Sequence, residues 1–208
     1  MGWLGLDDTD SLNGGCSTEV MFRLLESLPD TVSYANPRLV RLWPFAKQRT
    51  RGNAAVAVEL ITENETELMK HLDDWWTHHI SNLGGSIGVS DHSERKQYPA
   101  DPGMVWMSEK KSDAKFYSQS VSSEILLEDL PYVSRHWGGN GRIGATAAVL
   151  WPATQCTYEA ISWRIDDSEG PRRLDEDALD DVDSLEDTFL CRNPKLGTSL
   201  LAPRGNSP

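Results

Sequence analysis

The sequence predicts a fold of mixed helices and strands, α/β or α+β. Apolar residues make up 38% and charged residues 25% of its 208 positions, a composition that can build a hydrophobic core. Helix-like and strand-like apolar patterns alternate along the chain. The length favours two domains, and the polar composition near residues 110–116 places their boundary after residue 112, giving domains 1–112 and 113–208.

The period of the apolar residues predicts the elements of the first half. Val20, Leu24, Leu25 and Leu28 form one helical stripe, and Leu68 begins another that includes two adjacent tryptophans. The expected elements are a strand at 3–6, a helix at about 18–28, strands at 38–43 and 53–61, and a helix at 63–83.

In the second half, glycines and prolines separate shorter segments. The expected elements are a strand at 103–107, a helix at 118–130, a glycine-rich stretch opening onto the apolar segment 145–150, a strand at 158–165 and a short helix near 175–181. Residues 196–208 are rich in Gly, Pro and Ser without a closing element, so we expect the chain to be cut from a longer polypeptide.

Several protein classes are excluded by composition. No apolar run approaches the ~20 residues that a membrane span needs, and acids occupy the place of a signal peptide's apolar stretch. The three cysteines are far apart and none has C-x-x-C spacing, so neither a disulfide framework nor a complete zinc site is visible. We therefore expect a cytoplasmic protein.

The charge is unevenly distributed. A net charge of -12 argues against a protein that coats nucleic acid non-specifically. Residues 31–58 nevertheless contain no acid, and their interleaved basic and apolar residues predict a phosphate-binding surface. Residues 166–187 are strongly acidic. The basic residues of the acid-free stretch are Arg38, Arg41, Lys47, Arg49 and Arg51.

An acidic loop follows the first expected strand. Asp7, Asp8 and Asp10 place three carboxylates within four residues, and their mutual repulsion favours binding of a cation such as Mg²⁺. A glycine loop, 13–18, follows at once and opens a helix, whose N-terminal amides favour phosphate. Acids for a metal beside amides for phosphate predict a nucleoside triphosphate site.

The acidic loop has other interpretations. The aspartates can form an Asx-rich turn, with Ser17 or Thr18 capping the helix. An EF-hand starting at Asp8 fails because its sixth position is not glycine, and no Walker A lysine follows the glycines. A haloacid-dehalogenase-like phosphotransferase, with Asp8 as nucleophile and Asp10 beside it, stays open, although it leaves Asp7 and the glycine loop unexplained.

Five stretches carry a resemblance to a known family, in that family's order. They are GLDDTDS (5–11) with GGCST (14–18), RLVRL (38–42) with RTRGNAAV (49–56), DPGMV (101–105), GNGRIGA (139–145), and TYE (157–159) with GPRR (170–173). With these the chain closely resembles the archaeal tRNA(Ile) 2-agmatinylcytidine synthetase family, TiaS, over nearly its whole length.

The resemblance implies an enzyme that uses ATP and Mg²⁺ to attach agmatine to C2 of the wobble cytidine in CAU-anticodon tRNA(Ile). It also implies a kinase-like ATP-binding domain followed by a ferredoxin-like domain. The family's OB-fold and zinc ribbon would come after these, so the chain is expected to be the catalytic portion. The alternative is an inactive fragment that only binds nucleotide or tRNA. In either case we expect weak tRNA binding and no membrane association.

The site residues follow from the loops and the resemblance together. The family autophosphorylates a Thr directly after the loop Cys, where this chain has Ser17 with Thr18 next. Asp7, Asp8 and Asp10 are expected to hold the metal and, with Ser17 and Thr18, to be catalytic. The residues expected to bind the nucleotide are Gly14, Gly15, Cys16, Arg49, Arg51, Gly52, Asn53, Gly141, Arg142 and Gly144.

Overall fold

The structure is a computed structural model that describes residues 1–10, 15–48, 53–89, 96–109 and 111–153, with the backbone of two further short strands. The chain divides into two compact units, Met1–Pro152 and Ala153–Pro208. The two short strands, β8 (Cys191–Arg192) and β9 (Leu200–Leu201), pair antiparallel in the second unit. The strand expected at 158–165 and the helix near 175–181 lie outside the described residues.

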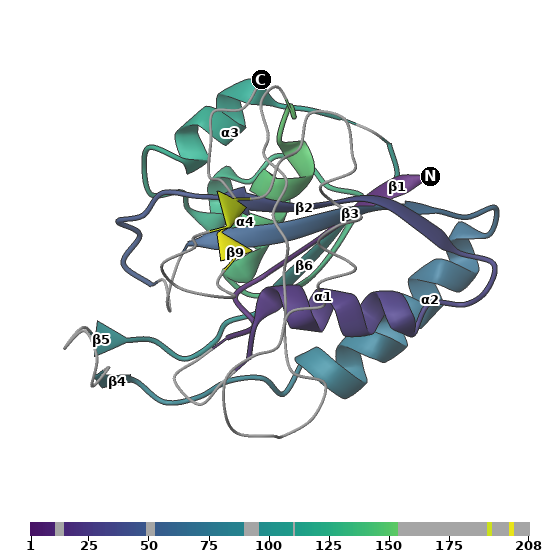
Figure 1. The fold of residues 1–208 in the computed structure, drawn as a ribbon, viewed down its shortest axis with the longest axis horizontal. Coiled ribbons are helices and arrows are strands. Elements are labelled where there is room, and N and C mark those ends of the chain that lie inside the picture. Colours follow the sequence, from purple (N-terminus) through teal and green to yellow (C-terminus); the bar gives the residue numbers. More distant parts are fainter. Residues whose placement is uncertain are drawn as a thin grey trace. The chain divides into compact units, whose positions relative to one another are not determined.

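The first unit is built on one antiparallel sheet of order β2-β3-β1-β6-β7 (Figure 1). Its strands are β1 (Gly2–Asp7), β2 (Ser33–Arg41), β3 (Ala54–Ile61), β6 (Gly103–Met107) and β7 (Arg135–Gly138). The central strand β1 pairs with β3 and β6, and Leu4 lies opposite Val58 on one side and Trp106 on the other. Because β1 is covered on both faces, its side chains are buried until Asp7. A separate pair, β4 (Gly88–Val89) and β5 (Lys96–Gln97), forms a small ladder.

Four strands of this sheet, β1, β2, β3 and β6, are connected through α1 (Ser17–Glu26) and α2 (Glu65–Trp75) in a β-α-β-β-α-β pattern. Strand β1 lies between β3 and β6. This is the split β-α-β arrangement of ferredoxin-like folds. The mixed helix-and-strand class is therefore confirmed. The boundary expected after residue 112 falls inside the first unit, and the division into a kinase-like and a ferredoxin-like domain stays a prediction.

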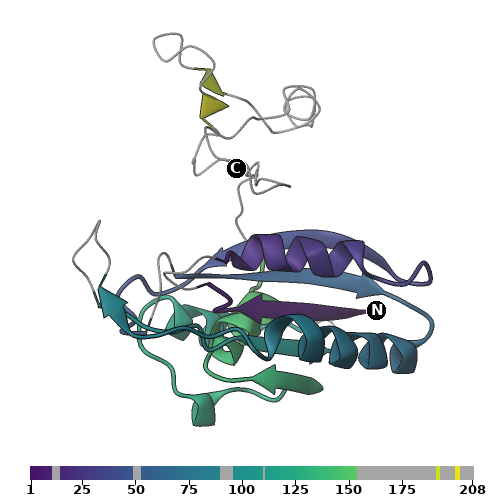
Figure 2. The same ribbon diagram turned by 90° about the horizontal axis from the view of Figure 1, so that it is seen from below.

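Both crossover helices cover the same face of the sheet. Leu24 of α1 and Leu68 and Leu72 of α2 are fully buried against the side chains of β1 and β3. Figure 2 views this face from below, with β1 visible between the two helices. The helical stripes predicted from the sequence therefore form the contact with the sheet, and burial of each such leucine contributes about 1.5–3 kcal/mol.

The opposite face of the sheet is covered by α3 (Ala114–Ser120) and α4 (Gly141–Leu150). Small residues face the sheet along much of α4, where Ala145 and Ala148 are fully buried. A methyl group at Gly5 would overlap the carbonyl of Ala145, so helix and strand approach unusually closely. This close approach brings the start of α4 beside the end of β1.

The expected helix at 118–130 is wrong. The Asp113 side chain accepts a 2.9 Å hydrogen bond from the Phe116 amide, so α3 starts at residue 114. The helix ends at Ser120, and just beyond it the hydroxyls of Ser122 and Ser123 donate to the carbonyls of Ser118 and Gln119. Such local bonds compete with continuation of a helix. A single 3₁₀ turn, Leu127–Asp129, follows instead.

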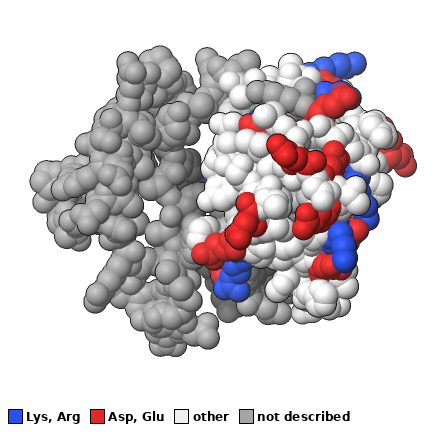
Figure 3. Space-filling model, turned by 90° about the vertical axis from the view of Figure 1, so that its right-hand side faces the viewer, with Lys and Arg blue, Asp and Glu red and all other residues white. Residues whose placement is uncertain are grey.

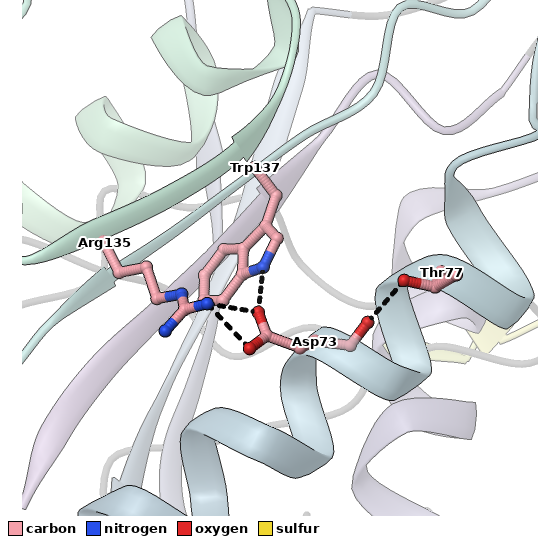
Figure 4. Close-up of polar contacts among 4 residues, drawn as sticks. All are labelled: Asp73, Thr77, Arg135 and Trp137. Carbon is pink, nitrogen blue, oxygen red and sulfur yellow. Dashed lines mark hydrogen bonds and ion pairs between the residues drawn. The ribbon is translucent and has the colours of Figure 1, made fainter.

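The edge strand β7 is attached to α2 by one carboxylate (Figure 4). Asp73 accepts hydrogen bonds from Arg135 Nη2 at 2.6 and 2.7 Å, and from Trp137 Nε1 at 2.8 Å. The backbone carbonyl of Asp73 also accepts a hydrogen bond from the Thr77 hydroxyl, within the continuation of α2 into a π-helical turn, Trp76–Ile80. This contact fixes the strand that leads directly into α4. Within the described part of the chain, no helix is long and apolar enough to cross a membrane.

Candidate functional site

The acidic loop lies where β1 ends, between α4 and the strand β6. Asp8 has a backbone φ of 57°, in the left-handed region that few residues other than Gly, Asn and Asp adopt. Such conformations cost about 1–3 kcal/mol and cluster at functional sites. The turn sends the side chains of Asp7 and Asp8 toward different neighbours.

Asp7 is turned toward α4. A methyl group at Gly144 would overlap its carboxylate, and would also come within 2.9 Å of the Leu42 side chain. Burial, followed by the charge of Asp8, raises the pKa of Asp7 well above its ordinary value. The absence of a side chain at Gly144 therefore makes room for this carboxylate.

Asp8 is turned toward the start of β6. Its Oδ2 accepts a hydrogen bond of 3.1 Å from the Asp101 amide, which favours the charged form. Burial nevertheless raises the pKa of Asp8 to about 7, and the charges of Asp10 and Asp101 act in the same direction. Asp8 thus titrates near neutral pH, as functional carboxylates often do.

Asp101 connects this loop to α4 and is a site residue that the sequence prediction missed. Its Oδ2 accepts hydrogen bonds from the Asn140 amide at 2.9 Å and from Asn140 Nδ2 at 2.7 Å. Its carbonyl accepts a third, from the Gly141 amide at 2.9 Å. In the sequence, Asp101 belongs to the triplet DPG (101–103) and Asn140 to the triplet GNG (139–141). Neither triplet indicates that the two residues are in contact.

The N-terminus of α1 packs against the same acidic loop. Thr9 Oγ1 donates a buried 3.0 Å hydrogen bond to Ser17 Oγ, the first residue of the helix. Gly15 has a φ of 91°, and a side chain there would come within 2.7 Å of the Thr9 carbonyl. Thr18 is half-buried, and its Oγ1 lies 2.9 Å from the exposed Cys16 Sγ. The structure therefore brings the predicted acids together with Gly15, Cys16, Ser17 and Thr18, whereas Gly14 lies outside the described residues.

Arg38 has a different position from the phosphate surface predicted for it. Its guanidinium lies 3.6 Å from the centre of the Trp3 ring and donates to the carbonyls of Val149 and Trp151. Burial lowers its pKa to about 10. A cation bound to the last carbonyls of α4 stabilises the end of that helix, so Arg38 has a role in the fold, and its prediction as a phosphate contact stays a prediction that these bonds disfavour.

The other basic residues of this stretch are only partly described. Arg41 and Lys47 are exposed, and Lys47 Nζ lies 3.8 Å from Glu124. Arg49, Arg51 and Gly52 lie outside the described residues. Asn53 is described, and its Nδ2 donates a 2.7 Å hydrogen bond to the Trp43 carbonyl, which closes the base of the β2–β3 loop.

The predicted nucleotide-binding residues of α4 lie on two sides of the helix. Gly141 and Gly144 face the end of β1, where a methyl group at Gly141 would come within 2.6 Å of the Asp7 carbonyl. Arg142 is half-buried, and its Nε donates to the Gly139 carbonyl at 3.1 Å. Both glycines therefore permit close packing, and the assignment of these residues to nucleotide binding stays a prediction.

The donors of the acidic loop fit a hard cation in their chemistry. Carboxylates that raise one another's pKa are stabilised by a nearby positive charge. No three His, Cys, Asp or Glu side chains of the described residues form a group that could hold a metal by themselves. Mg²⁺ usually takes one or two carboxylates together with water and phosphate oxygens, so the loop fits such an ion through part of its acids, and metal binding by Asp7, Asp8 and Asp10 stays a prediction.

The visible surface is not uniformly basic. Figure 3 shows the side on which α2 and the N-terminus lie in Figure 1, where Asp and Glu are interspersed with Lys and Arg. This side of the described residues offers no continuous basic patch to a nucleic acid.

Two family models match parts of this chain. Residues 3–69 match the family model of the TiaS TCKD domain, and residues 139–208 match that of the TiaS FLD domain. The first match contains the acidic loop and α1, and the second begins just before α4. The two matches therefore include the elements that meet at the site.

Individual relatives carry the same family name. The isoleucine-tRNA 2-agmatinylcytidine synthetases TiaS of Thermoplasma volcanium and Pyrobaculum neutrophilum are 30% and 31% identical, over 90% and 99% of this chain. A solved complex of TiaS with its isoleucine tRNA and ATP superposes with a TM-score of 0.64 at 26% identity, over 88% of this chain and 44% of that one. The chain spans about half the length of the curated relatives, 46% and 48% for these two. On the two family models and these relatives together, the chain belongs to the TiaS family.

Proposed function

We propose that this chain is the catalytic portion of an ATP-dependent tRNA-modifying ligase. The reaction is attachment of agmatine to C2 of the wobble cytidine of CAU-anticodon tRNA(Ile), giving 2-agmatinylcytidine. The observation that carries the proposal is that the acidic loop lies beside the N-terminus of α1, where Thr9 donates a hydrogen bond to Ser17 and Gly15 packs against Thr9. The names of the relatives support it, as do the ATP and the isoleucine tRNA of the solved TiaS complex.

In this proposal the acidic loop handles the phosphates of ATP. Asp7, Asp8 and Asp10 hold Mg²⁺, and when bound this ion neutralises charge on the phosphates and orients them. The chain itself positions the carboxylates: Gly144 leaves space for Asp7, and the Asp101 amide holds Asp8. Burial raises the pKa of both carboxylates, because their charged forms are poorly solvated. A bound cation stabilises those charged forms, so its binding is favoured.

The glycine loop and the arginines complete the proposed nucleotide site. Gly15 and Cys16 place backbone amides at the start of α1, where phosphate is favoured by the helix dipole, and Gly14 is proposed from the sequence to bind phosphate with them. Arg49 and Arg51, next to Gly52 and Asn53, offset charge that develops on the phosphates. The start of α4 forms the other wall with Gly141 and Gly144, whereas Arg142, predicted from the sequence to bind the nucleotide as well, lies on the other side of that helix.

Of the two candidate phosphoryl acceptors, Thr18 is the one we propose. Ser17 is buried, and its Oγ already accepts the hydrogen bond from Thr9. Thr18 is half-buried, and its described side-chain contact is with the exposed Cys16 thiol. Phosphopeptide mass analysis after incubation with ATP should find the phosphate on Thr18, and Thr18→Ala should lose it while Ser17→Ala retains it. A phosphate on Ser17 alone would contradict this assignment.

A second candidate function follows from the length of the chain. Because it spans about half of its relatives, the chain can bind nucleotide or tRNA without completing the reaction. The negative net charge and the hydrogen bonds that hold Arg38 to the carbonyls of Val149 and Trp151 favour weak tRNA binding by this portion. The phosphotransferase alternative instead predicts phosphate release from simple phosphoesters through Asp8 and Asp10 without ATP.

One experiment separates these functions. The chain is incubated with unmodified CAU-anticodon tRNA(Ile), ATP, Mg²⁺ and agmatine. The tRNA is then digested to nucleosides, and these are identified by mass spectrometry. We expect 2-agmatinylcytidine with the unchanged chain and with Asp30→Asn, an exposed acid used as the matched control, but not with Asp8→Asn. ATP binding without modified cytidine would favour the binding fragment, and phosphoester hydrolysis without ATP would favour the phosphotransferase.

A further inference from the structure

A pocket of about 290 Å³ lies beside α4, away from the acidic loop. Val105 of β6 and Thr146 of α4 are among its lining residues and are fully buried. Leu130 and Val133 supply apolar walls, and His136 and Arg142 are polar lining residues. The volume is near the lower end of the range for ligand pockets, roughly 300–1,000 Å³, and suits a group of about one ring.

This pocket is on a different side of α4 from the proposed nucleotide site. Gly141 and Gly144 face β1 and Asp7, whereas Arg142 and Thr146, four residues apart, line the pocket. None of the three aspartates of the acidic loop is among the lining residues. Residues at i and i+4 share one face of a helix, so α4 separates the two places.

The hydroxyl of Thr146 has no hydrogen-bond partner among the described residues although it is buried. Thr residues inside helices usually satisfy this group by donating to the carbonyl four residues earlier. Native proteins leave few buried polar atoms unsatisfied, and each one requires an explanation such as an absent ligand or water. Thr146 is one of the residues that line the pocket, so a group bound there is a candidate partner for this hydroxyl.

The charges of the lining residues indicate the charge of the ligand that the pocket would favour. Arg142 Nε donates to the Gly139 carbonyl, and no described carboxylate pairs with its guanidinium. His136, an exposed residue of β7, lies on the same pocket, and no Asp or Glu is among the lining residues. A guanidinium without an acidic partner favours a carboxylate or phosphate.

We propose that this pocket binds a small organic anion, a carboxylate or phosphate carried on a single apolar ring, at a site separate from ATP. The ring lies against Val105, Leu130 and Val133, the anionic group lies toward Arg142, and the Thr146 hydroxyl hydrogen-bonds to the ligand. The proposal does not depend on the proposed tRNA modification.

Phenyl phosphate is the probe, titrated into the 208-residue chain by calorimetry and by NMR. We expect saturable binding, with shifted resonances for Thr146 and His136, and weaker binding of the neutral analogue benzyl alcohol and of the cation benzylamine. Thr146→Val, which keeps the shape and removes the hydroxyl, should weaken binding about tenfold. Thr146→Ser, which keeps the hydroxyl, should weaken it less.

Each outcome supports or overturns the proposal. Undiminished binding in the presence of saturating ATP supports a separate site, whereas displacement by ATP overturns it. Equal binding of the neutral or cationic analogue overturns the anionic class. Absence of saturable binding, or resonance shifts confined to the acidic loop, overturns the pocket as a site even if the valine variant does not fold.

Discussion

Replacing Asp8 by Asn should make the folded protein more stable at pH 8 and should also remove its use of ATP. Asn tolerates the left-handed backbone that Asp8 adopts, and its amide oxygen can still accept the Asp101 N–H. The substitution therefore removes the charge with little change in geometry. A carboxylate that serves function in an unfavourable environment often lowers the stability of the folded protein. Its replacement is therefore expected to raise stability and to lower activity.

The magnitude follows from the pKa of Asp8, which rises from 3.8 to about 7 on folding. Between these values the folded state keeps a proton that the unfolded state has lost, so the free energy of unfolding falls as the pH rises from about 4 to about 7. Roughly 3 pKa units correspond to about 4 kcal/mol. Water at the half-buried carboxylate reduces this to about 2 kcal/mol.

Urea unfolding at pH 5 and pH 8, without divalent metal, measures the effect. Asp8→Asn should be more stable than the unchanged chain by about 2 kcal/mol at pH 8, a rise in Tm of about 4–8 °C, and by less than half of this at pH 5. Asp30→Asn should show no such difference. Equal stability of Asp8→Asn and the unchanged chain at pH 8, or a gain independent of pH, would refute the electrostatic explanation.

Four further substitutions test the packing of the fold and the contacts proposed for tRNA and ATP. Gly144→Ala should destabilise the fold by about 1–3 kcal/mol in urea because its methyl group overlaps the Asp7 carboxylate, and normal stability would show that Asp7 lies elsewhere. Arg38→Ala should cost about 2 kcal/mol by the same assay. Filter binding of tRNA should show an unchanged salt dependence for Arg38→Ala, whereas Arg41→Ala, at an exposed residue, should lower the salt slope. Asp101→Ala should cost about 1–3 kcal/mol in thermal unfolding because Asn140 loses its partner, and should weaken ATP binding, whereas unaffected ATP binding would separate Asp101 from the site.

The parts of the fold that local pattern determines could be predicted from the sequence. The strand at residues 103–107 and the apolar faces of α1 and α2 follow directly from the spacing of apolar residues. The acidic loop was also visible, because its aspartates are close together in the chain and their repulsion is a local property.

The parts that depend on distant contacts could not be predicted. Asp8 and Asp101 meet across 93 positions, and Arg38 binds carbonyls more than 110 positions away, so no local pattern reports either contact. Glycine disfavours a helix by about 1 kcal/mol, yet Gly141 and Gly144 lie within α4. Close packing of α4 on β1 requires them there, and that requirement exists only in the folded protein.

The proposed function depends above all on binding of ATP together with Mg²⁺ by the acidic loop. Calorimetric titration of ATP into the chain, with and without Mg²⁺, tests this most directly. We predict binding that requires Mg²⁺, is kept by Asp30→Asn and is lost by the stably folded Asp8→Asn. Binding of equal strength by Asp8→Asn, or binding indifferent to Mg²⁺, would contradict it.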